Sequence, residues 1–130
     1  MVWSKAWTSS KKPRKQRAYV AMAPLHVKRA SLGAHLSKEL AKRYGRRTLE
    51  LRKGDQVMVM RGEFKKKIGT VEWVNLKKPA VRISGLERIR KDGSKVGVLF
   101  HPSKLQIIQL ELSDKRRAEK LKVMGSVKAS

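Results

Sequence analysis

The sequence predicts a mostly β fold: a small barrel of short strands, preceded by a basic, partly helical extension and followed by a short basic helix. Between residues 48 and 112, short β-forming runs alternate with turn signals and leave no room for helices between them, which favours a barrel over a βαβ fold. Before Arg47 we find no strand-like alternation. We therefore divide the chain into an extension (1–47), a barrel (48–112) and a tail helix (113–130).

The extension includes a basic, low-complexity stretch at residues 9–17 (SSKKPRKQR). Such a stretch buries too little apolar surface to order alone, and we expect little of residues 1–47 to be ordered without a polyanion. Two short helices are predicted after it. The first begins at Pro24 and stops at Gly33. The second is capped by Ser37 and stops at Gly45.

The barrel region contains a series of strand candidates separated by turns. Asp92-Gly93 lies between two alternating runs and predicts a hairpin. Trp73 alternates with Val71, which predicts a place in the core or at the barrel rim. The expected strands are residues 55–61, 68–74, 80–83, 86–90, 95–100 and 105–112.

The last part of the chain, residues 113–130, is predicted to be a basic helix. Ser113 or Asp114 can cap its start, and Gly125 can end it. We expect its few apolar residues, Leu121 and Met124 among them, to pack only lightly.

Charge restricts the classes of partner. Lys and Arg number 33 against 10 Asp and Glu, giving a net charge of +23. Such a chain is stabilised by an anionic partner: nucleic acid, an anionic membrane or an acidic protein. The basic segments lack the large apolar face of a membrane-surface helix, and no apolar run approaches the roughly 20 residues that span a bilayer. Because cysteine is absent, disulfides and thiolate metal sites are excluded.

Residues 53–62 (KGDQVMVMRG), together with Lys65 and residues 68–71 (IGTV), resemble the KOW motif. Gly-Asp makes the bend into the first strand, and Gly62 can take a positive φ in the turn. Gly69 lets a neighbouring backbone approach. The family often has glycine where this chain has Lys66, which is a departure in the turn. The resemblance implies an SH3-like barrel in a nucleic-acid context.

The flanking segments 25–29 (LHVKR), 36–40 (LSKEL) and 101–104 (HPSK), with Tyr44, resemble the universal KOW protein family of the large ribosomal subunit, counted twenty-fourth in bacteria and twenty-sixth in eukaryotes. The resemblance covers about residues 11–115. The long N-terminal segment and the early end after the last helix favour the archaeal form.

This resemblance implies a structural role in the cytoplasmic ribosome. The chain would bind the 5′ domain of large-subunit rRNA early in assembly, near the exit of the peptide tunnel. Its partners would be that rRNA and neighbouring large-subunit proteins. It would be a monomer within the ribosome, with neither a small-molecule substrate nor a cofactor.

The candidate rRNA-binding residues are mainly the basic side chains of the extension and of two barrel turns. Arginine binds phosphate through a bidentate fork, whereas lysine acts as a point charge. We expect recognition of RNA shape and backbone rather than a base code. The candidates are Lys11, Lys12, Arg14, Lys15, Arg17, His26, Lys28, Arg29, Lys38, Arg43, Arg46, Arg47, Arg61, Gly62, Lys65, Lys66, Lys67, Lys77, Lys78 and Lys104.

No catalytic constellation is found in the sequence. There is no nucleophile elbow, P-loop or paired-carboxylate arrangement, and Asp55 is explained by the bend at the strand entry. His26, His35 and His101 lack the spacing and the acidic or cysteine partners of a metal site. We interpret His101 as a turn residue. The chain is therefore not expected to be an enzyme or to bind a metal.

Two other functions remain open at this point. KOW barrels also occur in transcription factors that contact RNA polymerase, although those factors usually carry a further domain and less charge. An architectural DNA-binding protein is compatible with the charge as well.

Overall fold

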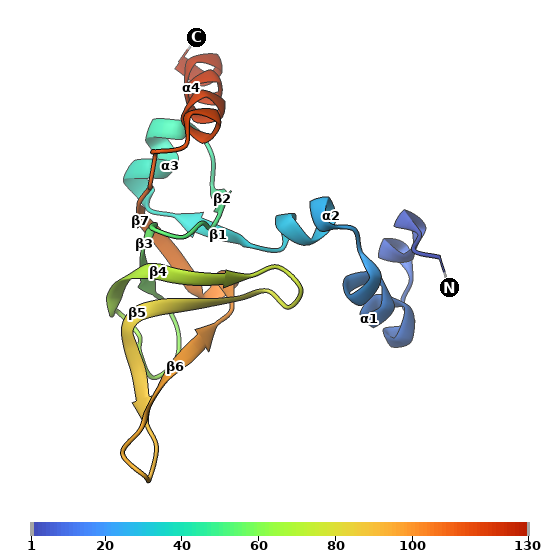
Figure 1. Ribbon diagram of the computed structural model, residues 1–130. Helices are drawn as coiled ribbons and strands as arrows, with labels where there is room; N and C mark the ends of the chain where they lie inside the picture. The colour runs from blue at the N-terminus through green and yellow to red at the C-terminus, as the bar shows by residue number, and fades with distance from the viewer. Residues whose placement is uncertain (1, 130) are drawn as a thin grey trace.

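The computed structural model describes residues 2–129, with side chains described for residues 2–122. Over this range seven strands form one strongly curved sheet in the order β2-β1-β7-β3-β4-β5-β6 (Figure 1). The mostly β, barrel-like fold expected from the sequence is confirmed. The strands are β1 (Gly33–Leu36), β2 (Thr48–Glu50), β3 (Gln56–Val59), β4 (Ile68–Asn75), β5 (Ala80–Ile89), β6 (Lys95–Phe100) and β7 (Leu105–Gln109).

The barrel core is built from alternate residues of these strands. Side chains on one face of a strand recur every second residue, so each strand contributes one inward row. Val57 and Val59 are fully buried, as the motif predicts. The remaining members of the core include Val71, Val81, Ile83, Phe100, Leu105 and Ile107.

β1 lies within the predicted extension and corrects its description. It pairs in parallel with β7 and antiparallel with β2, and Ala34 and Leu36 enter the core. The expectation of no strand before Arg47 is wrong, because four residues are too few to show a clear alternation. Gly33 accordingly opens a strand, and the helix before it, α2 (Leu25–Ala30), ends three residues earlier. The barrel core therefore includes residues from within 1–47, and the division of the chain at residues 47 and 112 stays a prediction.

α3 (Lys38–Tyr44) follows the sequence prediction closely. The Ser37 hydroxyl accepts from the Leu40 N–H at 3.4 Å, and Gly45 ends the helix with a φ of +63°. Both the cap and the stop are confirmed. Leu40 packs against the barrel core and orients the helix.

The β3–β4 turn has two backbone positions with positive φ. Gly62 has a φ of +95°, as predicted, and Lys66 has a φ of +69° at the position where the KOW family often has glycine. Lys66 is held there because its N–H donates to the Val59 carbonyl at 2.7 Å. The turn starts early, so β3 is shorter than the predicted 55–61. A Cβ on Gly69 would lie 2.8 Å from the Ser84 carbonyl oxygen, which confirms the predicted close approach.

β5 is longer than expected. The predicted runs 80–83 and 86–90 form one strand, because Gly85, with a φ of +80°, lies in an irregularity of its pairing with β6 and does not end it. The predicted hairpin at Asp92-Gly93 is confirmed, with Gly93 at a φ of +88°. The tip of this hairpin projects from the barrel (Figure 1).

Trp73 lies at the rim and not in the core. The β4–β5 register shifts between Val71 and Trp73, and this shift breaks the alternation on which a core position depended. Trp73 is 42 % exposed, whereas Val71 is buried.

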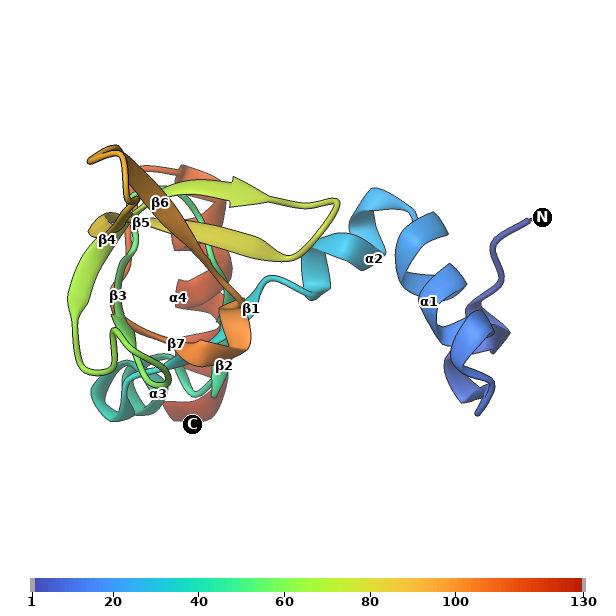
Figure 2. The same ribbon diagram turned by 90° about the horizontal axis from the view of Figure 1, so that it is seen from below.

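The N-terminal part of the extension projects from one side of the barrel (Figure 2). It consists of η1 (Lys5–Ser9), α1 (Pro13–Met22) and α2. Trp3 packs on α1, where its ring lies 5.3 Å from that of Tyr19 and its Nε1–H donates to the Tyr19 carbonyl. The sequence did not indicate α1, which includes much of the low-complexity stretch. That this part of the extension has little order without a polyanion stays a prediction.

α4 (Lys115–Ala129) lies beside α3 (Figure 1). Asp114 caps it by accepting from the Arg116 N–H at 3.0 Å. The predicted end at Gly125 is wrong, because a glycine inside a helix costs only about 1 kcal/mol and does not by itself stop it. Light packing is also wrong for Leu121, which is buried, and Arg117 is only 5 % exposed. Met124 lies outside the residues whose side chains are described.

Candidate nucleic-acid interface

Most of the predicted rRNA-binding side chains lie exposed on the surface. Lys28 and Arg46 are the exceptions, since both are partly buried. Exposure alone does not define a site, but the fold brings several of these residues together from distant parts of the sequence. These residues form three groups, and the remaining predicted residues lie outside them.

The first group lies where the extension meets the β4–β5 turn. A groove of about 880 Å³ is lined there by Arg17 of α1, Lys28 of α2, and Lys77 and Lys78 of the turn. Its remaining lining includes apolar atoms of Val20 and other residues of the same two regions. We call it the extension groove. Lys28 Nζ donates to the Ala21 carbonyl at 3.0 Å, which fixes its position.

The second group surrounds the β3–β4 turn. Lys65, Lys66 and Lys67 are exposed on this turn, and the Lys104 carbonyl accepts from the Met60 N–H at 2.8 Å just before it. Lys67 Nζ lies 5.0 Å from the centre of the Phe64 ring. Arg61 and Gly62 belong to the same turn. Among the turn residues the acidic side chain is Glu63, and it pairs with Arg88 at 2.7 Å.

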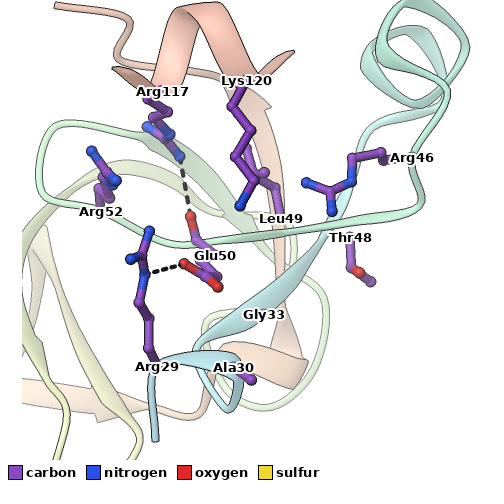
Figure 3. A pocket seen from close by; sticks show the side chains of 10 residues that line it. All are labelled: Arg29, Ala30, Gly33, Arg46, Thr48, Leu49, Glu50, Arg52, Arg117 and Lys120. Carbon is purple, nitrogen blue, oxygen red and sulfur yellow. Dashed lines mark hydrogen bonds and ion pairs between the residues drawn. The ribbon is translucent and has the colours of Figure 1, made fainter. Parts of the chain in front are cut away.

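The third group forms a basic pocket of about 190 Å³ between the extension, β2 and α4 (Figure 3). Arg29 and Arg46 were predicted, whereas Arg52, Arg117 and Lys120 were not. Arg29 Nε donates to a Glu50 carboxylate oxygen at 2.5 Å. The close-up shows Glu50 within a group of basic side chains that approach from several elements.

Arg117 of α4 and Asp55 of the KOW motif form a buried ion pair that sequence reasoning missed. The carboxylate accepts from Arg117 Nη1 at 2.7 Å and Nη2 at 2.8 Å, and also from the N–H groups of Arg52 and Glu111. Arg117 additionally donates to the carbonyls of Glu50 and Glu111. Asp55 is 0 % exposed. In the sequence, the signal that could have indicated a buried partner is a single acidic residue, Asp55, directly before an uncharged β-forming run.

A second ion pair joins the start of α4 to the KOW entry. Arg52 donates to the Asp114 carboxylate, and this hydrogen bond lowers the pKa of that carboxyl below its ordinary value of 3.8. Together the two pairs place α4 against the beginning of the barrel.

The remaining predicted residues do not join these groups. Lys38 and Arg43 lie on α3, where the Arg43 guanidinium lies 5.5 Å from the Tyr44 ring, and Arg47 lies just after that helix. His26 is exposed on α2. The basic residues Lys11, Lys12, Arg14 and Lys15 lie at the start of α1 and before it.

The histidines and acids hold no metal-like arrangement among the described residues. His101 Nδ1 instead caps η2 (Pro102–Lys104) by accepting from the Ser103 N–H at 3.2 Å, so its turn role is confirmed. Within residues 2–129, no helix has the length and apolar character needed to cross a membrane.

The chain matches a protein-family model described as ribosomal proteins L26 eukaryotic and L24P archaeal over residues 10–123. It is also similar to curated archaeal proteins named large ribosomal subunit protein uL24. The protein of Nanoarchaeum equitans is 46 % identical over 95 % of this chain and 84 % of its own length. That of Methanosphaera stadtmanae is 42 % identical over 86 % of this chain and 96 % of its own length.

A third relative, the uL24 protein of Methanosarcina barkeri, is 42 % identical over 87 % of this chain and 97 % of its own length. The match therefore extends over the extension, the barrel and the start of α4 together, and is not confined to the KOW motif. The chain belongs to the ribosomal protein family that comprises eukaryotic L26 and archaeal L24P.

Proposed function

We propose that this chain is a structural component of the large ribosomal subunit that binds rRNA through the extension groove and the β3–β4 turn. Its family consists of ribosomal proteins, and its relatives are named as large-subunit proteins. The observation that carries the binding surface is the convergence of Arg17, Lys28, Lys77 and Lys78 on one groove.

Family membership confirms that the chain is a ribosomal protein rather than an enzyme, and that its place is the cytoplasmic ribosome. The finer placement is part of the proposal. The chain would bind the 5′ domain of the rRNA, act early in assembly and lie near the peptide tunnel exit, beside other large-subunit proteins. This placement is supported by the resemblance of the sequence and not by the geometry.

The mechanism of binding is electrostatic and geometric. Each lysine or arginine that neutralises a phosphate releases condensed counterions, so affinity falls with salt. The extension groove adds selectivity for RNA shape, because an RNA backbone that enters it meets cations of α1, α2 and the β4–β5 turn at the same time. A folded RNA whose backbone fits this spacing is favoured over a flexible polyanion.

Sedimentation of a cell extract on a gradient tests the subunit assignment. After a moderate-salt wash we expect the chain in the large-subunit peak. Recovery with RNA polymerase instead would support the transcription alternative and overturn the proposal. Equal affinity for duplex DNA and for the rRNA 5′ domain in direct competition would also count against it.

Charge removal tests the proposed surface. Replacing Lys77 and Lys78 with Ala should weaken binding to a 5′-domain RNA and reduce the salt slope by up to about 0.9 for each lost phosphate contact. The matched control is the double replacement of Lys91 and Lys95, which lie on the β5–β6 hairpin outside the three groups. Equal losses in both variants would show that only net charge matters.

A further inference from the structure

An apolar groove of about 460 Å³ lies between the extension and β4, and no part of the proposed surface uses it. Its apolar lining includes Leu32, Leu51, Trp73 and Leu76, and Lys53 and Glu72 also line it. Trp73 on β4 is 42 % exposed, and Leu76, just after the end of β4, is 37 % exposed. We call it the Trp73 groove.

Trp73 is held in place from the neighbouring strand. The Arg82 guanidinium lies 5.5 Å from the Trp73 ring centre, and the two residues are cross-strand partners on β5 and β4. Gly97 of β6 makes room for Arg82, since a Cβ at that position would lie 2.6 Å from Arg82 Nε. Arg82 does not line the Trp73 groove, and Trp73 stays 42 % exposed beside this contact. The ring is therefore fixed and still accessible.

The Trp73 groove adjoins the basic pocket of Figure 3. The two cavities share Arg29, Glu50 and Arg52 as common wall residues. On the far side of this wall, Arg46 and Lys120 line the basic pocket and have no ion pair among the described residues. An apolar aromatic surface is thus next to a site with unneutralised positive charge.

This combination matches the chemistry of one unpaired nucleotide. Its base is a flat ring that stacks on tryptophan, and its phosphate is an anion that arginine and lysine bind. We propose that an unpaired rRNA nucleotide places its base on Trp73 and its backbone phosphate in the basic pocket. The inference rests on the proposed rRNA binding and adds a specific contact to it. An apolar protein segment would use the groove but would leave the charge of the basic pocket unmatched.

Tryptophan fluorescence measures the base contact directly. In the full chain with Trp3→Phe and Trp7→Phe, Trp73 is the sole tryptophan. Titration with a single-stranded RNA of about ten nucleotides should quench it saturably, and duplex RNA of equal charge should quench it less. Circular dichroism checks that the two replacements keep the fold. Equal quenching by a polyglutamate peptide of the same charge would overturn the proposal, because such a peptide offers no ring to stack.

Affinity measurements on the otherwise native chain separate stacking from charge. Trp73→Ala should weaken binding to a 5′-domain RNA about tenfold, whereas Trp73→Phe should keep most of it, since phenylalanine also stacks. If native chain and Trp73→Ala bind this RNA equally, the Trp73 contact is refuted while the proposed function stands. If the native chain itself does not bind the RNA, the proposed function fails first.

The phosphate half has its own matched pair on α4. Lys120→Gln should reduce the salt slope on single-stranded RNA by about 0.7, the value for one contact. Lys115→Gln removes the same charge from the same helix at an exposed position that does not line the basic pocket. A Lys115 variant that lowers the slope as much as the Lys120 variant would refute the pocket as the phosphate site.

Discussion

Removal of the Arg117 side chain should destabilise the barrel, although Arg117 lies outside it on α4. Arg117→Ala leaves Asp55 buried with only the Arg52 and Glu111 N–H groups as donors, and frees the carbonyls of Glu50 and Glu111. Truncation of one partner of a buried ion pair costs about 3–5 kcal/mol. Because the two backbone donors remain, we expect a loss at the lower end, about 3 kcal/mol.

Asp55→Ala should cost more, because it removes the acceptor of two backbone N–H groups as well as the partner of a buried guanidinium. Asp55→Asn is the milder replacement to measure, since its amide oxygen can still accept a hydrogen bond from one of the two backbone N–H groups. The double variant should lose less than the sum of the single losses, by about 1–3 kcal/mol, because the second truncation removes a group that the first left unpaired.

Urea unfolding at constant moderate salt, followed by circular dichroism, measures these differences. With a slope of about 1–3 kcal/mol per molar, a loss of 3 kcal/mol moves the midpoint by about 1–3 M. Arg116→Ala is the control, because Arg116 is exposed on the same helix and should change stability by less than about 0.5 kcal/mol. Equal effects of the Arg116 and Arg117 variants, or strict additivity of the Asp55 and Arg117 losses, would refute the ion-pair reasoning.

Three further predictions concern single backbone and charge positions. Lys66→Gly should stabilise the chain by about 1 kcal/mol in the same urea assay, because a φ of +69° is strained for lysine; unchanged or lower stability would contradict the turn geometry. Gly69→Ala should destabilise by about 1–3 kcal/mol, since the added Cβ meets the Ser84 carbonyl oxygen, and a neutral result would mean that β5 moves away freely. Asp114→Asn removes a carboxylate whose pKa is lowered in the folded state. Native Asp114 therefore stabilises the fold at pH values above its ordinary pKa of 3.8, and this stabilisation is lost as the pH falls through the folded pKa. The stability difference between native chain and Asp114→Asn should therefore shrink below about pH 4 in unfolding curves recorded across pH, and a difference that does not change with pH would assign Asp114 no such role.

The strands and turns with strong local signals were predictable from the sequence. Val57 and Val59 alternate clearly, and Gly62, Gly45 and Gly93 are glycines at positions where the backbone has positive φ. These features depend on residues close together in the chain, so a local pattern contains the necessary information.

The missed features depend on contacts between distant segments. β1 is a strand because β7 lies beside it, and its four residues give no pattern of their own. Arg117 resembles its neighbours on a basic helix, and only its position opposite Asp55 distinguishes it. The same distinction between local and long-range information applies to the candidate site. Exposed lysines were predicted individually, whereas the convergence of Lys28 with Lys77 on one groove required the fold.

The parallel pairing of β1 with β7 has a consequence for the order of events during synthesis. β7 pairs with both β1 and β3, so these two pairings cannot form until the ribosome has synthesised β7. Such pairing closes long loops and slows folding. Until β7 emerges, Ala34, Leu36 and Val57 remain without their final neighbours. Until the barrel closes, the newly made chain therefore exposes apolar strands, and its net charge of +23 opposes self-association during that time.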